Sequence, residues 1–232
     1  MDDLYIGAYW GPRRESADQC ADRLTQCLRS LANCDAIFRD WYKKGRANRT
    51  RLAKPVDWSS HDILVNLLNS GRSRLDSDHS VMEDLGFIVS LWNRAERLKA
   101  SDFMARCGLY TCNPFLGNSF VLDLPKDLGT LAQKENLLKA FVAIVEAWEP
   151  NWAGVISRRS RDAREFVPGR PFVDWMIYVN RTDVDSSALP ATASTKCLNE
   201  HGAVIVVQNE PINPDNERDL ENVRSVERAL GL

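Results

Sequence analysis

The segment from Asp123 to Lys126 carries residue types found in metal-dependent nuclease sites, an aspartate followed closely by a lysine. Such a site needs a second carboxylate two residues before the lysine, because the metal is held by oxygen ligands. Here that position is Leu124, whose side chain cannot bind a metal. We therefore interpret this segment as the end of a strand followed by a turn at Pro125.

The histidines and cysteines also lack the spacing of a metal or nucleophile site. His61, His79 and His201 are far apart, and Cys107 and Cys112 have neither a second cysteine pair nor a nearby histidine. No motif places a histidine to activate Cys112. The chain has no Gly-x-Ser-x-Gly elbow and no glycine-rich phosphate loop after a strand. We therefore expect no catalytic residues, no metal and no cofactor.

Three further cysteines indicate a buried helix and a reducing environment. Cys20, Cys27 and Cys34 recur every seven residues, which places them on the apolar stripe of one helix, where free cysteine packs as a small hydrophobe. A disulfide framework is not expected in a chain of this size. The acidic N-terminus lacks a signal peptide's basic start, and no apolar run is long enough for a membrane helix. We expect a cytoplasmic protein with no membrane contact.

The apolar pattern predicts strands in runs, with helices between the runs rather than after each strand. Strands are expected over residues 4–10, 87–92, 103–110, 120–124, 153–157, 172–179 and 203–207. Helices are expected over about 16–34, 59–71 and 130–148 and from 215 onward, with a short helix over 37–42. This order predicts an α+β fold, with a largely antiparallel sheet of about six to seven strands and three to four main helices packed on it. No linker or repeat divides residues 1–232, so we expect a single domain.

Charge is segregated, although the net charge is only −2. Residues 39–54 hold seven basic residues against one acidic, and residues 158–170 hold five arginines against two acidic residues. Residues 200–221 hold six acidic residues against one basic. These stretches are either solvated loops and helix faces or a dipolar surface that steers a charged partner. A nucleic-acid-binding module using the basic 39–54 and 158–170 clusters is an alternative, which the near-neutral total charge does not favour.

The N-terminal run from Ile6 to Ser16, IGAYWGPRRES, followed by an amphipathic helix, resembles the immunity protein 52 family of bacterial toxin and type VI secretion systems. Further matching pieces occur in order along nearly the whole chain: Trp41–Gly45, Leu85–Phe87, Leu91–Asn93, Arg106–Gly108, Asn118–Ser119, Trp148–Trp152 and Val204–Asn216. The resemblance implies an antitoxin that is not an enzyme. It also implies a cognate toxin partner with a restriction-endonuclease-like nuclease domain, bound tightly to protect the producing cell.

Three groups of residues are candidates for the partner-binding surface. Trp10, Arg13 and Arg14 are expected to be exposed residues of the N-terminal run. A basic loop with Lys43, Lys44 and Arg46 could grip an acidic, metal-binding catalytic centre. Alternatively, an acidic surface could mimic nucleic acid, with the carboxylates of Glu210, Asp215 and Glu217. The sequence does not choose between the basic and the acidic surface.

Overall fold

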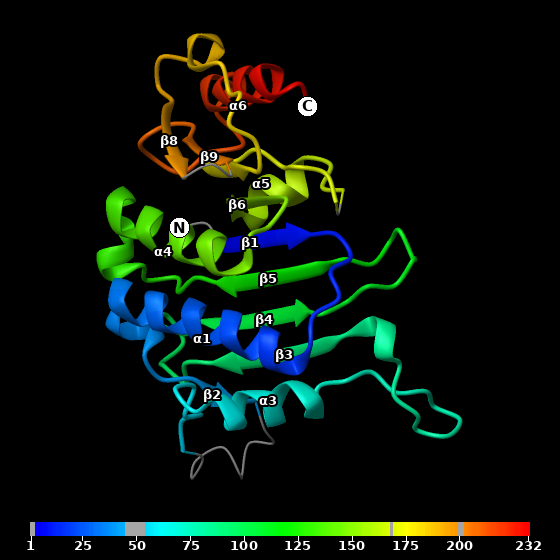
Figure 1. Cartoon of the computed structure of the whole chain (residues 1–232). Coiled ribbons are helices and arrows are strands. Elements are labelled where there is room, and N and C mark those ends of the chain that lie inside the picture. The colour runs from blue at the N-terminus through cyan, green and yellow to red at the C-terminus, as the bar shows by residue number, and fades with distance from the viewer. Residues whose placement is uncertain (1–2, 45–53, 168, 199–201) are drawn as a thin grey trace.

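A nine-stranded sheet forms the centre of the molecule in the computed structural model, which describes residues 3–44, 54–167, 169–198 and 202–232. The strand order is β2-β3-β4-β5-β1-β6-β7-β9-β8, and every neighbouring pair is antiparallel (Figure 1). The strands are β1 (Leu4–Trp10), β2 (Tyr42–Lys43), β3 (Phe87–Trp92), β4 (Asp102–Cys107), β5 (Asn118–Asp123), β6 (Trp152–Ser157), β7 (Met176–Val179), β8 (Ser194–Leu198) and β9 (Gly202–Val206).

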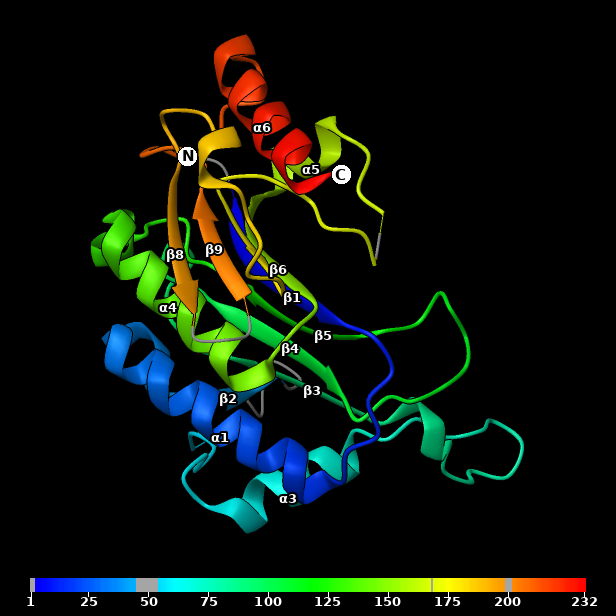
Figure 2. The ribbon, with the colours of Figure 1, turned by 45° about the horizontal axis from the view of Figure 1, so that its top comes forward.

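Three helices cover one face of the sheet: α1 (Ala17–Cys34), α3 (His61–Ser70) and α4 (Lys134–Trp148). Ser16 and Gln19 form a capping box that starts α1. Two further helices, α5 (Arg158–Ala163) and α6 (Glu217–Leu230), lie on the other side, near the β6–β9 end (Figure 2). No helix among the described residues combines the length and apolar character needed to cross a membrane.

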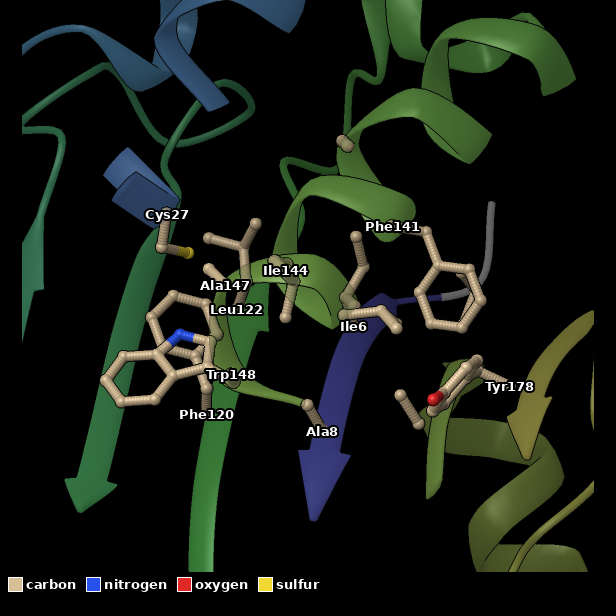
Figure 3. Close-up of a cluster of buried hydrophobic side chains, with 14 of the residues drawn as sticks. Ile6, Ala8, Cys27, Phe120, Leu122, Phe141, Ile144, Ala147, Trp148 and Tyr178 are labelled. Atoms are coloured by element: carbon tan, nitrogen blue, oxygen red, sulfur yellow. The ribbon is translucent and has the colours of Figure 1, made fainter. Parts of the chain in front are cut away.

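The main core lies between the sheet and the layer of α1 and α4. A chain of aromatic rings with centroids 4.8–6.2 Å apart crosses it, namely Phe38, Trp41, Phe103, Phe120, Trp148 and Trp10. Cys27 of α1 points at Trp148 within this cluster (Figure 3). Burial raises the pKa of the Cys27 thiol to about 12. Cys20 and Cys27 are therefore core residues as the heptad spacing predicted, while Cys34 is half-buried.

The predicted α+β class and antiparallel sheet are confirmed, but the count of six to seven strands is too low. The two missed strands lack the pattern that reveals a strand. β2 has only two residues, and β8 is an edge strand in which four of five residues are exposed. The short helix predicted over 37–42 is present only as a 3₁₀ helix at Ala36–Phe38, and Tyr42 already belongs to β2. Helix α5 was also missed, since Ser160 is its only buried residue and it shows no apolar stripe.

Candidate functional site

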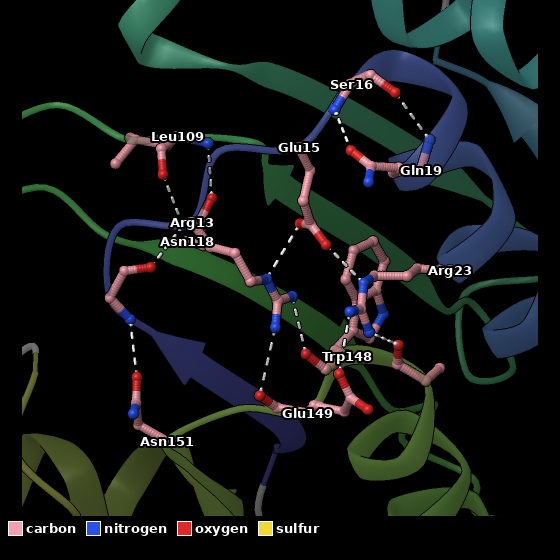
Figure 4. A network of polar contacts seen from close by, with 12 residues as sticks. Arg13, Glu15, Ser16, Gln19, Arg23, Leu109, Asn118, Trp148, Glu149 and Asn151 are labelled. Carbon is pink, nitrogen blue, oxygen red and sulfur yellow. Dashed lines mark hydrogen bonds and ion pairs between the residues drawn. The ribbon is translucent and has the colours of Figure 1, made fainter.

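The N-terminal run packs inward rather than outward. Trp10 is only 6% exposed and stacks on Trp148, with ring centroids 5.3 Å apart. The Arg13 guanidinium lies 5.0 Å from the centroid of the Trp10 ring and donates to the carbonyl oxygen of Trp148 at 2.9 Å (Figure 4). The expectation that Trp10 is exposed is therefore wrong, because its indole completes the aromatic core. Arg14 is exposed and lies over the Tyr110 ring.

Charged residues of the same run fasten α1 to the end of α4. The Glu15 side chain is 7% exposed and pairs with Arg13 at 3.1 Å and Arg23 at 2.6 Å. Arg23 also donates to the carbonyl oxygen of Ala147 at 2.9 Å and pairs with Glu149. The last carbonyls of a helix have no partner within the helix, so these arginines satisfy groups that α4 leaves open. This network is part of the framework that holds the two helices together.

Two asparagines clamp the chain where it leaves β1. Asn151 accepts a hydrogen bond from the amide of Gly11 at 2.8 Å. Asn118 donates to the carbonyl oxygens of Gly11 at 2.7 Å and Leu109 at 3.0 Å, and accepts from the Leu109 amide at 2.9 Å. The pieces around Arg13, Asn118 and Asn151 thus meet in space and act together as scaffold. Arg14, which is exposed, stays a candidate for partner binding.

One residue from each basic cluster pairs with an aspartate of the sheet. Lys44 pairs with Asp102 at 3.1 Å, and Arg158 pairs with Asp123. Asp102 and Asp123 are direct neighbours across β4 and β5. Burial raises the pKa of the Asp123 carboxyl, although Arg158 opposes this shift. These four residues come from separate parts of the sequence, and no sequence motif predicted that they would pair in this way.

The remaining basic candidates and the suspected nuclease motif do not form a site among the described residues. Lys43 is exposed in β2, whereas Arg46 lies outside the described residues. Asp123 ends β5, and Lys126 pairs with Asp3 at 3.2 Å, so the aspartate and the lysine have different partners. No group of three His, Cys, Asp or Glu side chains that could hold a metal ion occurs in the part of the chain that is described.

The acidic candidates are mostly neutralised by their own neighbours. Asp215 pairs with Arg159, and Glu217 pairs with Arg224 at 2.6 Å. Further along α6, Arg228 donates to the Glu221 carboxylate and lowers its pKa. Glu210 is exposed. A surface that mimics nucleic acid needs a row of unpaired carboxylates, which the ion-paired residues of α6 do not provide.

One part of the sheet lacks a covering layer among the described residues. α5, α6 and the side chains of Phe166 and Phe172 pack on the side opposite α1 and α4, over β1, β6, β7 and β9. Over β3, β4 and β5, alternate side chains on that side are half-buried or exposed. We call this surface the uncovered face; it consists of Ile88, Ser90, Trp92, Asp102, Met104, Arg106, Ser119, Val121 and Asp123.

The uncovered face runs into a cavity beside an exposed phenylalanine. Met104 is 47% exposed near the middle of the face, and Phe115 of the β4–β5 loop is 90% exposed. A cavity of about 540 Å³ is lined by Arg106 and Phe115 together with Tyr9 and Trp152. The alternation of Phe103, Ala105 and Cys107 already implied that residues 104 and 106 point the other way, but sequence reasoning did not single them out.

Comparisons with known proteins agree with this fold. The family model described as immunity protein 52 matches residues 2–232. A solved structure of the Pseudomonas aeruginosa T6SS protein PA0821 is similar with a TM-score of 0.58 and 13% identity, covering 99% of this chain and 72% of that one. At this identity the likeness shows a shared fold alone. No curated protein matches the chain. Because the family model spans nearly its whole length, the chain belongs to the immunity protein 52 family.

Proposed function

We propose that this chain is an immunity protein that binds a cognate nuclease toxin and neutralises it, thereby protecting the cell that produces both. The observation that carries the proposal is the match of the immunity protein 52 model to residues 2–232. The similar fold of a T6SS protein supports a toxin delivered by that secretion system. In this proposal the toxin has a restriction-endonuclease-like nuclease domain, which the resemblance to the immunity protein 52 family implies.

Inhibition in this proposal is a matter of binding alone. A protein that blocks a nuclease needs a rigid surface of about 800 Å² that fits the toxin, and it needs no reactive group of its own. Pairs of nuclease toxins and immunity proteins are among the tightest complexes known. The ion-paired scaffold around Arg13, Glu15 and Arg23 supports this role, because a rigid framework loses little conformational freedom on binding.

The proposal is tested by co-expression with the nuclease toxin encoded beside this chain in its own genome. The chain should restore growth to bacteria that produce the toxin, and purified chain should bind a catalytically inactive toxin variant in calorimetry. An unrelated nuclease toxin serves as the control that should be neither bound nor neutralised. Failure to rescue growth from every neighbouring toxin, with the chain folded and abundant, would remove the proposal.

Binding of nucleic acid by the two basic clusters is the weaker candidate. Arg158 and Arg159 are ion-paired with aspartates, and Arg164 lies 3.5 Å from both Asp174 and Glu227. Paired arginines release few counterions from a nucleic acid backbone and therefore contribute little affinity. A gel-shift with a DNA duplex at about 50 mM salt tests this candidate; the proposed function predicts no shift.

A further inference from the structure

We propose that the toxin docks on the uncovered face, with Phe115 as its apolar anchor and Arg106 as its ionic anchor, and that the docked toxin surface presents a carboxylate to Arg106. This inference rests on the proposed function and deepens it by assigning the surface. Three observations within the described part of the chain carry it: one side of β3–β5 has no covering layer, Phe115 is exposed, and Arg106 has no acidic partner.

The uncovered face has the size and shape of part of a protein interface. Three neighbouring strands of six residues, with strands spaced about 4.8 Å, cover roughly 14 by 20 Å. That area is less than half of the roughly 800 Å² that each partner contributes to a standard interface. The β4–β5 loop projects beyond one end of these strands and can supply part of the remainder (Figure 1).

Arg106 is the one basic residue among those that define the uncovered face. It lies between Ile88 and Ser119 in the register of the sheet and is half-buried. Among the described residues it makes no ion pair, whereas Lys44 and Arg158 on the same side are matched by Asp102 and Asp123. Arg106 lines the cavity, where its guanidinium can form a bidentate pair with a carboxylate from another chain.

Phe115 is presented by a structured loop. The Asn113 side chain accepts a hydrogen bond from the Phe115 amide at 3.0 Å, and Pro114 restricts the backbone between them. Asn118 ties the start of the loop, at Leu109, to the start of β5. A large aromatic ring held 90% in solvent beside a cavity is typical of an interface anchor, because its burial takes place on binding.

The composition around these two anchors favours a protein partner. Aromatic residues, Met and Arg are enriched in interface cores. Here Arg106, Phe115 and Tyr9 line one cavity, and Met104 lies on the same side of β4 as Arg106. Charge complementarity favours an acidic partner surface, because Arg106 has no carboxylate partner among the described residues. Nuclease centres hold their divalent metals with carboxylates, so the toxin's catalytic groove is a surface of the right chemistry.

The experiment measures binding of a catalytically inactive toxin, the product of the neighbouring gene, to single variants of the full chain. Phe115→Ser and Arg106→Glu alter the proposed anchors. The matched controls are Leu98→Ser, which changes an apolar residue 60% exposed in the β3–β4 loop, and Arg218→Glu, which changes an exposed arginine of α6. Thermal unfolding of each variant shows whether it is folded.

We expect Phe115→Ser to weaken toxin binding about 10–100-fold and Arg106→Glu by at least about 100-fold, with both controls near wild type. Arg106→Glu should also slow association at low salt. If wild type binds the toxin and both folded anchor variants bind equally well, the surface assignment is wrong while the proposed function stands. If wild type does not bind, the proposed function itself fails.

Two other occupants are distinguished by the same variants. A DNA duplex that binds wild type and is lost in Arg106→Glu would overturn the assignment to a protein partner. Sedimentation of the chain alone gives the other test. A wild-type dimer that Phe115→Ser converts to a monomer would show that a second copy occupies the face instead of the toxin.

Discussion

Replacing Asn118 with alanine removes three hydrogen bonds from one buried side chain, and the exposure of each partner indicates how much each bond contributes to stability. Asn118 is 1% exposed and Leu109 is also 1% exposed. The Leu109 amide loses the acceptor that Asn118 provides, and an unsatisfied buried amide costs about 1–3 kcal/mol. The Leu109 carbonyl keeps its bond from the Arg13 amide at 2.8 Å, so its loss is limited to about 1 kcal/mol.

The third bond contributes least, because Gly11 is exposed and water can replace the Asn118 donor at its carbonyl. The sum is a loss of about 2–4 kcal/mol in the free energy of unfolding. For a chain of this length that corresponds to a melting temperature lower by about 4–16 °C. Both quantities follow from urea and thermal unfolding monitored by tryptophan fluorescence.

Ser119→Ala is the matched control for this prediction. Ser119 is the next residue of β5 and lies on the uncovered face, so its replacement should change the free energy of unfolding by less than about 0.5 kcal/mol. The reasoning about the clamp is refuted if Asn118→Ala loses less than about 1 kcal/mol, or if both variants lose equally.

The remaining predictions concern packing, thiol reactivity and pH. Gly71→Ala should lower the free energy of unfolding by more than about 3 kcal/mol, because a Cβ would lie 1.8 Å from the carbonyl oxygen of Ile88. In the control Gly11→Ala the nearest atom to the new Cβ lies at 3.9 Å, so its free energy of unfolding in urea should be close to that of the wild type. Iodoacetamide pulses read by mass spectrometry should label the exposed Cys112 and Cys197 at pH 8, while Cys27, with a pKa of about 12, reacts only after unfolding; equal rates would contradict its burial. The raised pKa of Asp123 means that the folded state holds this proton more tightly than the unfolded state, so its contribution to stability decreases as pH rises from about 4, the pKa of an unfolded aspartate, through the higher pKa of the folded state. Asp123→Asn should remove this decrease in stability with pH. An unchanged pH profile of unfolding would show that the pKa of the Asp123 carboxyl is not raised.

Much of the fold could be predicted because its elements carry strong local patterns. β1 and α1 begin and end within a residue of the predicted boundaries, since Gly11-Pro12 ends the strand and Ser16 caps the helix. β8 could not be predicted, because an edge strand exposed on both faces keeps no apolar alternation. The predicted strand from 172 shortens to β7 because Phe172 packs on Tyr5 and Trp152 outside the sheet.

The candidate site was harder to predict than the fold, for two physical reasons. Trp10 and Arg13 belong to the most recognisable run of the chain, yet they are held by α4 through the Trp148 ring and carbonyl. A run shared within a family indicates framework as readily as function. Arg106 and Phe115 show no local motif, because they become a surface only when three strands and a loop come together.

The most direct test of the account is a titration of the toxin's nuclease activity with increasing amounts of this chain. A binding inhibitor removes one toxin molecule for each molecule added, so activity should fall in a straight line and reach zero near one equivalent. Complete loss of activity at a small fraction of an equivalent would show catalysis by the chain. Full activity in the presence of a several-fold excess would show that the chain does not act by occupying the toxin.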